Sequence, residues 1–408
     1  MTRILLVTGK GGVGKTTVAA ATAVHAASRG LRTIVLSTDP AHSLADAFAQ
    51  PIGDDVTPIS VRLDAQQLDA RRRFEAAWSE VRDWFVEVLG WAGADAIEAE
   101  ELAVIPGLDE LFALADLKQH ATSGAYDLVV VDCAPTAETI RLLSLPDVMA
   151  WYMDKAFHAT RRVARMTRPV LHRLAGVPVA SDAVFGALER FYARVDGVRE
   201  LLTDGTITSA RLVVNPERMV VAEARRTFTY LSLFGHHVDA VIANRLLPNA
   251  VVDPYFDAWR ESQRNELIGI EAAFAPVPVL AADLASSEVL GVEALGAFGA
   301  VLYGALDPAA RLADVEPLRL EAAGDRFVLS LHLPFSASSD IDLARTDDEL
   351  LVAVGPHRRA VALPDSLRGR QVGARSERRR TDDDTRGDDD HDPLTSRRAR
   401  VRRIDVEG

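Results

Sequence analysis

The sequence predicts an α/β fold in which helices cover both faces of a mostly parallel sheet. Three observations lead to this expectation. Short apolar runs recur along the chain, each run is bounded by polar residues or glycine, and segments of helix length separate the runs. The runs predicted as strands are 4–7, 33–36, 128–131, 212–214, 241–243 and 277–280. Since ligands bind at the carboxyl ends of such strands, the residues after each run are the first candidates for a functional site.

A glycine-rich loop follows the first run. It satisfies the phosphate-loop pattern G-x-x-x-x-G-K-[ST] and carries a second lysine, Lys10, besides the Lys15 of the pattern. Residues 18–27 are rich in alanine and lack proline, so we expect a helix that directs its N-terminal amides at phosphate. Lys15 is expected to reach the β- and γ-phosphates of ATP, and the Thr16 hydroxyl to ligate Mg²⁺. The loop residues predicted to bind nucleotide are Gly9, Lys10, Gly11, Gly12, Val13, Gly14, Lys15, Thr16 and Thr17.

Lysine is rare in this chain. It occurs only at positions 10, 15, 118 and 155, and every other basic residue except histidine is arginine. A compact ammonium group fits a tight phosphate cradle better than a planar guanidinium does. Lys10 and Lys15 are therefore both predicted to be catalytic.

The composition predicts a soluble protein with more than one structural unit. A chain of 408 residues corresponds to two or three units of about 150 residues each. The net charge of −13 argues against nucleic-acid binding, and the lack of an apolar stretch of membrane-spanning length argues against direct membrane insertion. The phosphate loop leaves no room for a signal peptide, so a cytoplasmic location is expected. The single cysteine, Cys133, excludes an intrachain disulfide and a cysteine-pair metal site within one chain.

Two aspartates follow predicted strands at the ligand edge. Asp132 comes directly after the run 128–131 and is expected to join the magnesium shell, directly or through water. Asp39 follows the run that begins at residue 33 and is expected to orient the attacking water. The alternative for each is capping of a turn or helix. For His42, a role in capping or packing is as consistent with the sequence as a catalytic role.

Four segments together resemble the arsenite-pump and tail-anchored-protein-targeting ATPases, the ArsA family. They are the loop with two lysines, Asp-Pro-Ala-His-Ser at 39–43, Ile-Pro-Gly-Leu-Asp-Glu at 105–110 and the segment 132–143. The resemblance spans most of residues 1–305 and includes Val-Val-Asn-Pro-Glu at 213–217 and Ala-Asn-Arg-Leu-Leu at 243–247.

The resemblance implies specific roles for individual residues. Lys10 would reach the nucleotide of a partner subunit, and Asp39 would position water. Pro135, Glu217 and Asn244 would contribute to nucleotide binding. One phosphate loop per chain then implies a homodimer.

The chain also departs from the family pattern. The family's switch segment reads Asp-Thr-Ala-Pro-Thr-Gly-His-Thr, and this chain has Cys133 in place of threonine and Ala137-Glu138 in place of glycine-histidine. Whether the phosphate-sensing part still transmits its state to the residues after this segment therefore stays open. A single cysteine permits neither the cysteine-based metalloid site nor the Cys-x-x-Cys zinc bridge of some relatives. Two functions stay open: a chaperone or targeting factor for hydrophobic polypeptide, and the ATPase subunit that energises an anion or arsenite exporter. A regulatory scaffold is a third possibility.

Two predicted helical segments carry apolar side chains at helical spacing. A client-binding face and ordinary core packing are both compatible with this spacing. The residues are Phe74, Trp78, Val81, Phe85 and Val88 in the first segment, and Met149, Met153 and Phe157 in the second.

Three divisions of the chain are predicted. Residues 1–313 form the ATPase domain, with helical inserts at about 64–120 and 146–205. Residues 314–373 alternate between apolar and polar positions and resemble a small heat-shock-protein (α-crystallin-like) β-sandwich. Residues 374–408 form a largely disordered acidic and basic tail, because opposing charge blocks replace apolar residues. Val401, Ile404 and Val406 are candidates for a last strand.

Overall fold

The computed structural model describes most of the chain. The described residues are 2–39, 43–68, 79–91, 108–153, 157, 160–164, 166–167, 180–323, 326–336, 340–345, 349–362, 371–376 and 401–407. His42, Phe74, Trp78, Lys155 and the tail residues 377–400 lie outside the described part, so the expectations for them stay predictions.

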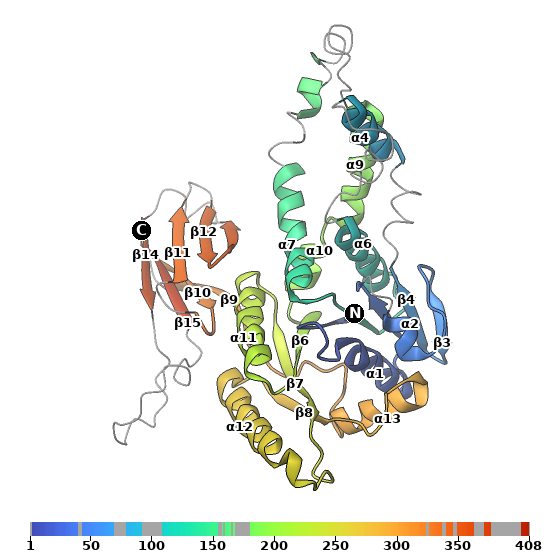
Figure 1. Cartoon of the computed structure of the whole chain (residues 1–408). Helices are drawn as coiled ribbons and strands as arrows, with labels where there is room; N and C mark the ends of the chain where they lie inside the picture. Colours follow the sequence, from blue (N-terminus) through green and yellow to red (C-terminus); the bar gives the residue numbers. More distant parts are fainter. Residues whose placement is uncertain are drawn as a thin grey trace.

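A sheet of eight strands forms the centre of the first unit (Figure 1). Its strand order is β3-β4-β2-β5-β1-β6-β7-β8, and every neighbouring pair is parallel except β3 and β4. The strands are β1 (Arg3–Gly9), β2 (Thr33–Ser37), β3 (Thr57–Ser60), β4 (Leu63–Gln67), β5 (Leu128–Asp132), β6 (Thr208–Val214), β7 (Val238–Leu246) and β8 (Val279–Asp283). Strands β2, β5 and β6 are buried along their whole length, as expected for a sheet covered on both faces. The predicted α/β class is confirmed.

Two strands were missed by the sequence prediction. β4 contains residues 64–67, which were assigned to the first helical insert, and β3 pairs with it at the edge of the sheet. β4 is polar in sequence but largely buried, because partners elsewhere in the fold satisfy its side chains. The Tyr126 hydroxyl donates to Asp64 Oδ2 at 2.8 Å, and Gln66 Oε1 lies 2.8 Å from His120 Nε2.

Helices surround the sheet and also extend beyond it. In Figure 1, α4, α6, α7 and α9 form an elongated helical extension at one end of the sheet, whereas α12 and α13 lie at the other end. The helical elements are α1 (Lys15–Ser28), α2 (Ser43–Phe48), α4 (Ser79–Trp91), α6 (Leu108–Thr122), α7 (Thr136–Tyr152), α9 (Asp182–Val195), α10 (Val198–Thr203), α11 (Arg218–Leu233), η2 (Pro254–Phe256), α12 (Asp257–Phe274) and α13 (Gly291–Tyr303).

The second predicted apolar face is largely packed in this structure. Phe157 is fully buried and makes an edge contact with the Phe185 ring at a centroid distance of 5.6 Å. Met153 packs against the same small cluster, and Met149 packs against the main core. Core packing therefore explains this stripe.

The C-terminal unit consists of two antiparallel sheets, with strand orders β14-β15-β10-β9 and β11-β12-β13. The strands are β9 (Leu318–Ala323), β10 (Arg326–His332), β11 (Ile341–Arg345), β12 (Glu349–Val354), β13 (His357–Ala362), β14 (Gln371–Ser376) and β15 (Val401–Glu407). The predicted boundary at residue 373 falls inside β14, and β15 pairs with β10, so the predicted tail supplies a strand of the sheet. The three candidates for a last strand all lie in β15.

The C-terminal unit packs on α11. Leu233 at the end of α11 is fully buried in the apolar cluster formed by the β-strands. The buried Arg359 guanidinium donates to the Leu233 carbonyl at 2.6 Å, and the Tyr230 and His357 rings lie 4.2 Å apart. The two units therefore share a packed interface.

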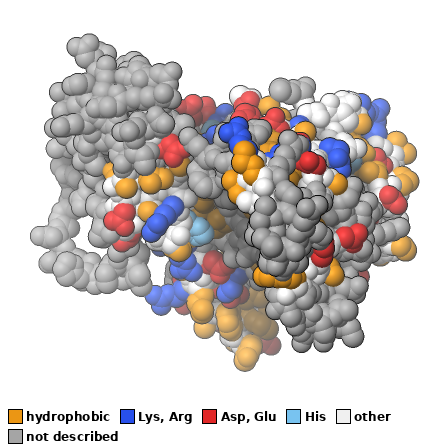
Figure 2. Space-filling view, turned by 90° about the horizontal axis from the view of Figure 1, so that it is seen from above, with side chains coloured by type: hydrophobic (Ala, Val, Ile, Leu, Met, Phe, Trp, Pro, Cys, Tyr) orange, Lys and Arg blue, Asp and Glu red, His pale blue; other side chains and the backbone are white. Residues whose placement is uncertain are grey.

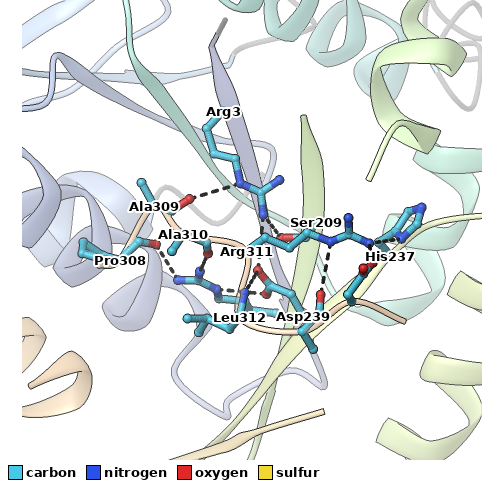
Figure 3. A network of polar contacts seen from close by, with 12 residues as sticks. Arg3, Ser209, His237, Asp239, Pro308, Ala309, Ala310, Arg311 and Leu312 are labelled. Atoms are coloured by element: carbon cyan, nitrogen blue, oxygen red, sulfur yellow. Dashed lines mark hydrogen bonds and ion pairs between the residues drawn. The ribbon is translucent and has the colours of Figure 1, made fainter. Parts of the chain in front are cut away.

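A buried ionic network fastens the segment after α13 to the amino ends of the strands (Figure 3). Asp239 accepts from Arg211 Nε at 3.2 Å and from Arg3 Nη2 at 3.3 Å. Arg211 also donates to the carbonyls of Pro308 and Ala310. Loss of one member of such a buried set costs about 3–5 kcal/mol, because an uncompensated charge remains.

The surface seen from above the helical extension is chemically mixed. Figure 2 shows acidic and basic side chains interspersed with hydrophobic ones on this face. Among the described residues, no helix combines the length and the hydropathy required to cross a bilayer.

Candidate nucleotide site

The glycine-rich loop joins the end of β1 to the start of α1. Gly14 precedes the helix with φ 95°, in the left-handed region that favours glycine. Asn244, near the carboxyl end of β7, donates from Nδ2 to the Val13 carbonyl at 2.8 Å. A side chain at position 14 would overlap Asn244 Nδ2, so the loop and β7 are in close contact.

Arg245 makes a second contact between β7 and the loop. Its Nη1 donates to the Gly12 carbonyl at 2.8 Å, and its φ of 59° is unusual for a residue with a side chain. Sequence reasoning did not select Arg245, because nothing local indicates that its side chain reaches the loop.

The two loop lysines differ in their surroundings. Lys15 is buried, and its Nζ donates to the Lys10 carbonyl at 3.3 Å. The Lys10 side chain is half-buried. Thr16 Oγ1 lies 3.0 Å from Ser43 Oγ at the start of α2, which adds Ser43 to the site.

Asp132 ends β5, where it pairs with Val7 of β1 just before the loop, and it is fully buried. Burial raises the pKa of its carboxyl group to about 7, and Asp39 adds to the rise, whereas Thr16, Lys15 and Ser37 oppose it. The Ser37 hydroxyl donates to Oδ2 at 3.2 Å, and Oδ1 makes no hydrogen bond with the part of the chain described here. A buried carboxylate oxygen in need of a partner, near the Thr16 hydroxyl, fits a hard divalent cation such as Mg²⁺.

The two strand-end loops contact each other. The Asp39 amide donates to Ser37 Oγ at 3.3 Å, and the Thr38 amide donates to the Asp132 carbonyl at 3.0 Å. The Ala134 amide in turn donates to Thr38 Oγ1 at 3.2 Å. The loops that carry Asp39 and Asp132 are thus joined by hydrogen bonds.

The remaining predicted site residues follow strands at the same edge of the sheet. Glu217 is exposed and precedes α11 without a capping bond from its side chain. It follows β6, which pairs with β1 up to Gly9. Pro135 is half-buried and immediately precedes α7. The structure therefore brings the predicted residues to one edge of the sheet.

A cavity of about 960 Å³ lies beside the loop. Gly14, Thr17, Asn244 and Arg245 line one side of it, and the segment 283–290 lines another. This segment begins at the last residue of β8, so its position at the end of a strand was the available signal, but sequence reasoning did not select it.

Comparison with known proteins identifies the family. Residues 2–304 match the family described as anion-transporting ATPase, which covers the sheet and every site residue named above. The chain belongs to the anion-transporting ATPase family. Residues 324–380 match the HSP20-like domain found in ArsA, which confirms the predicted α-crystallin-like resemblance.

Two of the relatives described here extend over nearly the whole chain, and a third covers about three quarters of it. A putative arsenical pump-driving ATPase of Chlorobaculum tepidum is 37% identical over 91% of this chain and 92% of its own. Putative arsenical pump-driving ATPase 1 of Aquifex aeolicus is 38% identical over 90% of this chain and 95% of its own. ATPase GET3B of Arabidopsis thaliana is 32% identical over 72% of this chain and 77% of its own. Membership of the family implies a nucleotide substrate.

Proposed function

We propose that this chain forms a homodimer that hydrolyses ATP with Mg²⁺, and that hydrolysis opens and closes the dimer to bind and release hydrophobic polypeptide. The observation that carries this proposal is the direct connection between the site and the helical extension. Asp132 is buried near Lys15, and α7 begins at Thr136 and runs into the extension (Figure 1). A change at the phosphate end of the site therefore has a short path to these helices.

The proposed roles follow from position. Lys15 holds the β- and γ-phosphates, Thr16 and Asp132 hold Mg²⁺, and Asp39 orients the attacking water. Bound Mg²⁺ supplies positive charge to the phosphate oxygens. Asn244 binds the base, for which the cavity beside the loop provides space.

The second lysine supports a dimer. The Lys10 carbonyl accepts from Lys15, whereas the Lys10 side chain remains half-buried in the loop. A cation delivered from a partner subunit to a transferring phosphoryl group contributes about 10³ to 10⁵ in rate. We assign this role to Lys10.

Exposed apolar side chains on α4 and between α7 and α9 support a polypeptide client. Trp91, Val163 and Met166 are 55%, 59% and 68% exposed, respectively. Methionine and large apolar side chains form adaptable surfaces for apolar partners. These residues replace Met153 and Phe157 as the proposed contact, because the latter two are packed.

The alternative is the ATPase subunit of an anion or arsenite exporter. The names of the Chlorobaculum and Aquifex relatives favour it. The chemistry of the single cysteine does not, because Cys133 is buried and burial raises its thiol pKa to about 12, which disfavours the thiolate that binds metalloid.

Steady-state hydrolysis in the presence of candidate effectors tests the proposal. We expect an apolar helical peptide to stimulate phosphate release and arsenite to have no effect. Val163→Glu and Met166→Glu should weaken peptide stimulation while basal hydrolysis is retained. Val301→Glu is the matched control, because Val301 is 77% exposed on α13, away from the extension. Stimulation by arsenite alone would favour the exporter, and absence of hydrolysis would refute both.

A further inference from the structure

We infer that Thr8 and Thr139 are positioning residues that tie the phosphate loop to the first turn of α7. The inference rests on the proposed function and deepens it, because it names the contact through which the nucleotide site acts on the helical extension. Neither residue was selected from the sequence. Thr8 directly precedes the glycine-rich loop, and Thr139 lies in α7.

The two hydroxyl groups form part of a continuous chain of hydrogen bonds. Thr8 Oγ1 donates to Thr139 Oγ1 at 3.1 Å, and Thr139 Oγ1 donates to the Ala134 carbonyl at 2.6 Å. Ala134 is also held from its amide side, because this amide donates to Thr38 Oγ1. The chain therefore links the residue before the loop, the first turn of α7, the segment after Asp132 and the residue before Asp39.

Burial makes these bonds difficult to replace. Thr8 and Thr139 are 0% and 1% exposed, and Ala134 is 7% exposed, so water has little access to any of the three. A buried polar group that loses its partner costs about 1–3 kcal/mol, whereas the same loss at the surface is compensated by solvent. These hydrogen bonds are thus expected to persist rather than to break when the segments that they join are displaced.

The geometry gives each threonine a distinct task. Thr8 lies in β1, which is held between β5 and β6 in the centre of the sheet, and it serves as a fixed point. Thr139 is bonded both to this fixed point and to the Ala134 carbonyl. When the Ala134 segment shifts in response to nucleotide, Thr139 follows it and keeps its bond to Thr8, so the helix that carries Thr139 turns about this fixed point.

This contact also bears on the departure of the chain from the family's switch pattern. Ala137 and Glu138 replace glycine and histidine, yet the threonine that completes the pattern is present as Thr139. Thr139 makes the bond to Ala134 with its own hydroxyl, so this link does not require the two replaced residues.

The test measures how nucleotide changes hydrogen exchange in α7, residues 136–152, for the full-length chain. Thr8→Val and Thr139→Val remove a hydroxyl at nearly constant volume, and Thr139→Ser keeps it. We expect both valine variants to bind a fluorescent ATP analogue within about twofold of wild type. The nucleotide response is the ratio of the α7 exchange rates measured in ATP and in ADP. Both variants should reduce this ratio by roughly fivefold, which corresponds to the free energy of one net hydrogen bond. Thr139→Ser should restore the wild-type ratio.

Two further variants separate positioning from general packing. In the double variant of Thr8 and Thr139, the loss should not exceed that of Thr139→Val alone, because Thr139→Val already removes the bond to Thr8. Thr22→Val is the matched control. The Thr22 hydroxyl is also buried and bonded to the Val18 carbonyl and the Tyr303 hydroxyl, but it has no part in this chain. Thr22→Val should keep the wild-type ratio.

The outcomes distinguish the inference from the proposed function. If wild type hydrolyses ATP and changes α7 exchange, but the valine variants respond like wild type or the double variant is additive, the inference is overturned alone. The same holds if Thr22→Val abolishes the response. If wild type neither binds nor hydrolyses ATP, the proposed function and the inference are both overturned.

Discussion

Replacement of Gly14 by alanine should disrupt the phosphate loop through two separable effects. The backbone at this position has φ 95°, and an added Cβ would overlap Asn244 Nδ2. Asn244 is only 4% exposed and is held by its bond to the Val13 carbonyl, so it cannot move away without loss of that bond.

The expected size follows from these two effects. A left-handed conformation costs a residue with a side chain roughly 1–2 kcal/mol. Loss of the bond between Asn244 and Val13 adds about 1 kcal/mol. Gly14→Ala should therefore lower the free energy of unfolding by about 2–3 kcal/mol, as the sum of the two effects.

Urea unfolding of the nucleotide-free protein is the appropriate assay, because contacts with bound phosphate then do not contribute. The shift is obtained from the midpoint at constant slope. Gly12→Ala is the matched control, since position 12 has φ 80° but no atom within 4 Å of an added Cβ. Gly12→Ala should therefore lower the free energy of unfolding only by the cost of the left-handed backbone, roughly 1–2 kcal/mol. In the double variant Gly14→Ala with Asn244→Ala, the loss should be less than additive by about 1 kcal/mol, because the bond to Val13 is lost only once. Equal costs for Gly12→Ala and Gly14→Ala, together with additivity in the double variant, would refute this reasoning.

Three further predictions concern other parts of the chain. Lys15→Ala should abolish nucleotide binding in calorimetry, whereas Lys10→Ala should bind nucleotide but lose about 10³-fold in turnover; near-normal phosphate release by Lys10→Ala would contradict the intersubunit role. Burial lowers the pKa of His236 from about 6.5 to about 4. Below about pH 6.5 the unfolded chain binds a proton at His236 and the folded chain does not, so the free energy of unfolding falls as the pH decreases from about 6.5 to about 4. At pH 5 this loss is roughly 2 kcal/mol relative to pH 7, and urea unfolding of His236→Gln should show a correspondingly smaller pH effect. Arg359→Leu should free the β-unit from α11 and increase its proteolysis, since a charged hydrogen bond worth about 1.5–3 kcal/mol is lost. Arg358→Leu, at an exposed neighbouring position, should leave the digestion pattern unchanged.

The sequence predicted the parts of the fold that have a local signal. The central strands are continuous apolar runs because they are buried on both faces, as β5 shows. β4 lacks this signal, because it contains the polar residues Asp64 and Gln66. Their side chains form hydrogen bonds with Tyr126 and His120, which are distant in the sequence, so the burial of β4 could not be predicted locally. β15 was only a candidate, since its pairing with β14 spans residues 377–400 and depends on long-range register.

The same distinction applies to the candidate site. Residues that directly follow strands, such as Asp39 and Asp132, could be selected because parallel strands bring their carboxyl ends to one edge. Arg245 and Ser43 could not, because their contacts with Gly12 and Thr16 depend on how separate segments approach the loop.

The central claim is that nucleotide state controls the affinity of the helical extension for apolar polypeptide. The most direct measurement is fluorescence anisotropy of an apolar helical peptide with the Asp39→Asn protein, in saturating ATP and in saturating ADP. Since a ligand shifts a conformational equilibrium only through its different affinity for the two forms, the account predicts tighter binding in ATP than in ADP. Equal affinity in the two nucleotides would contradict it.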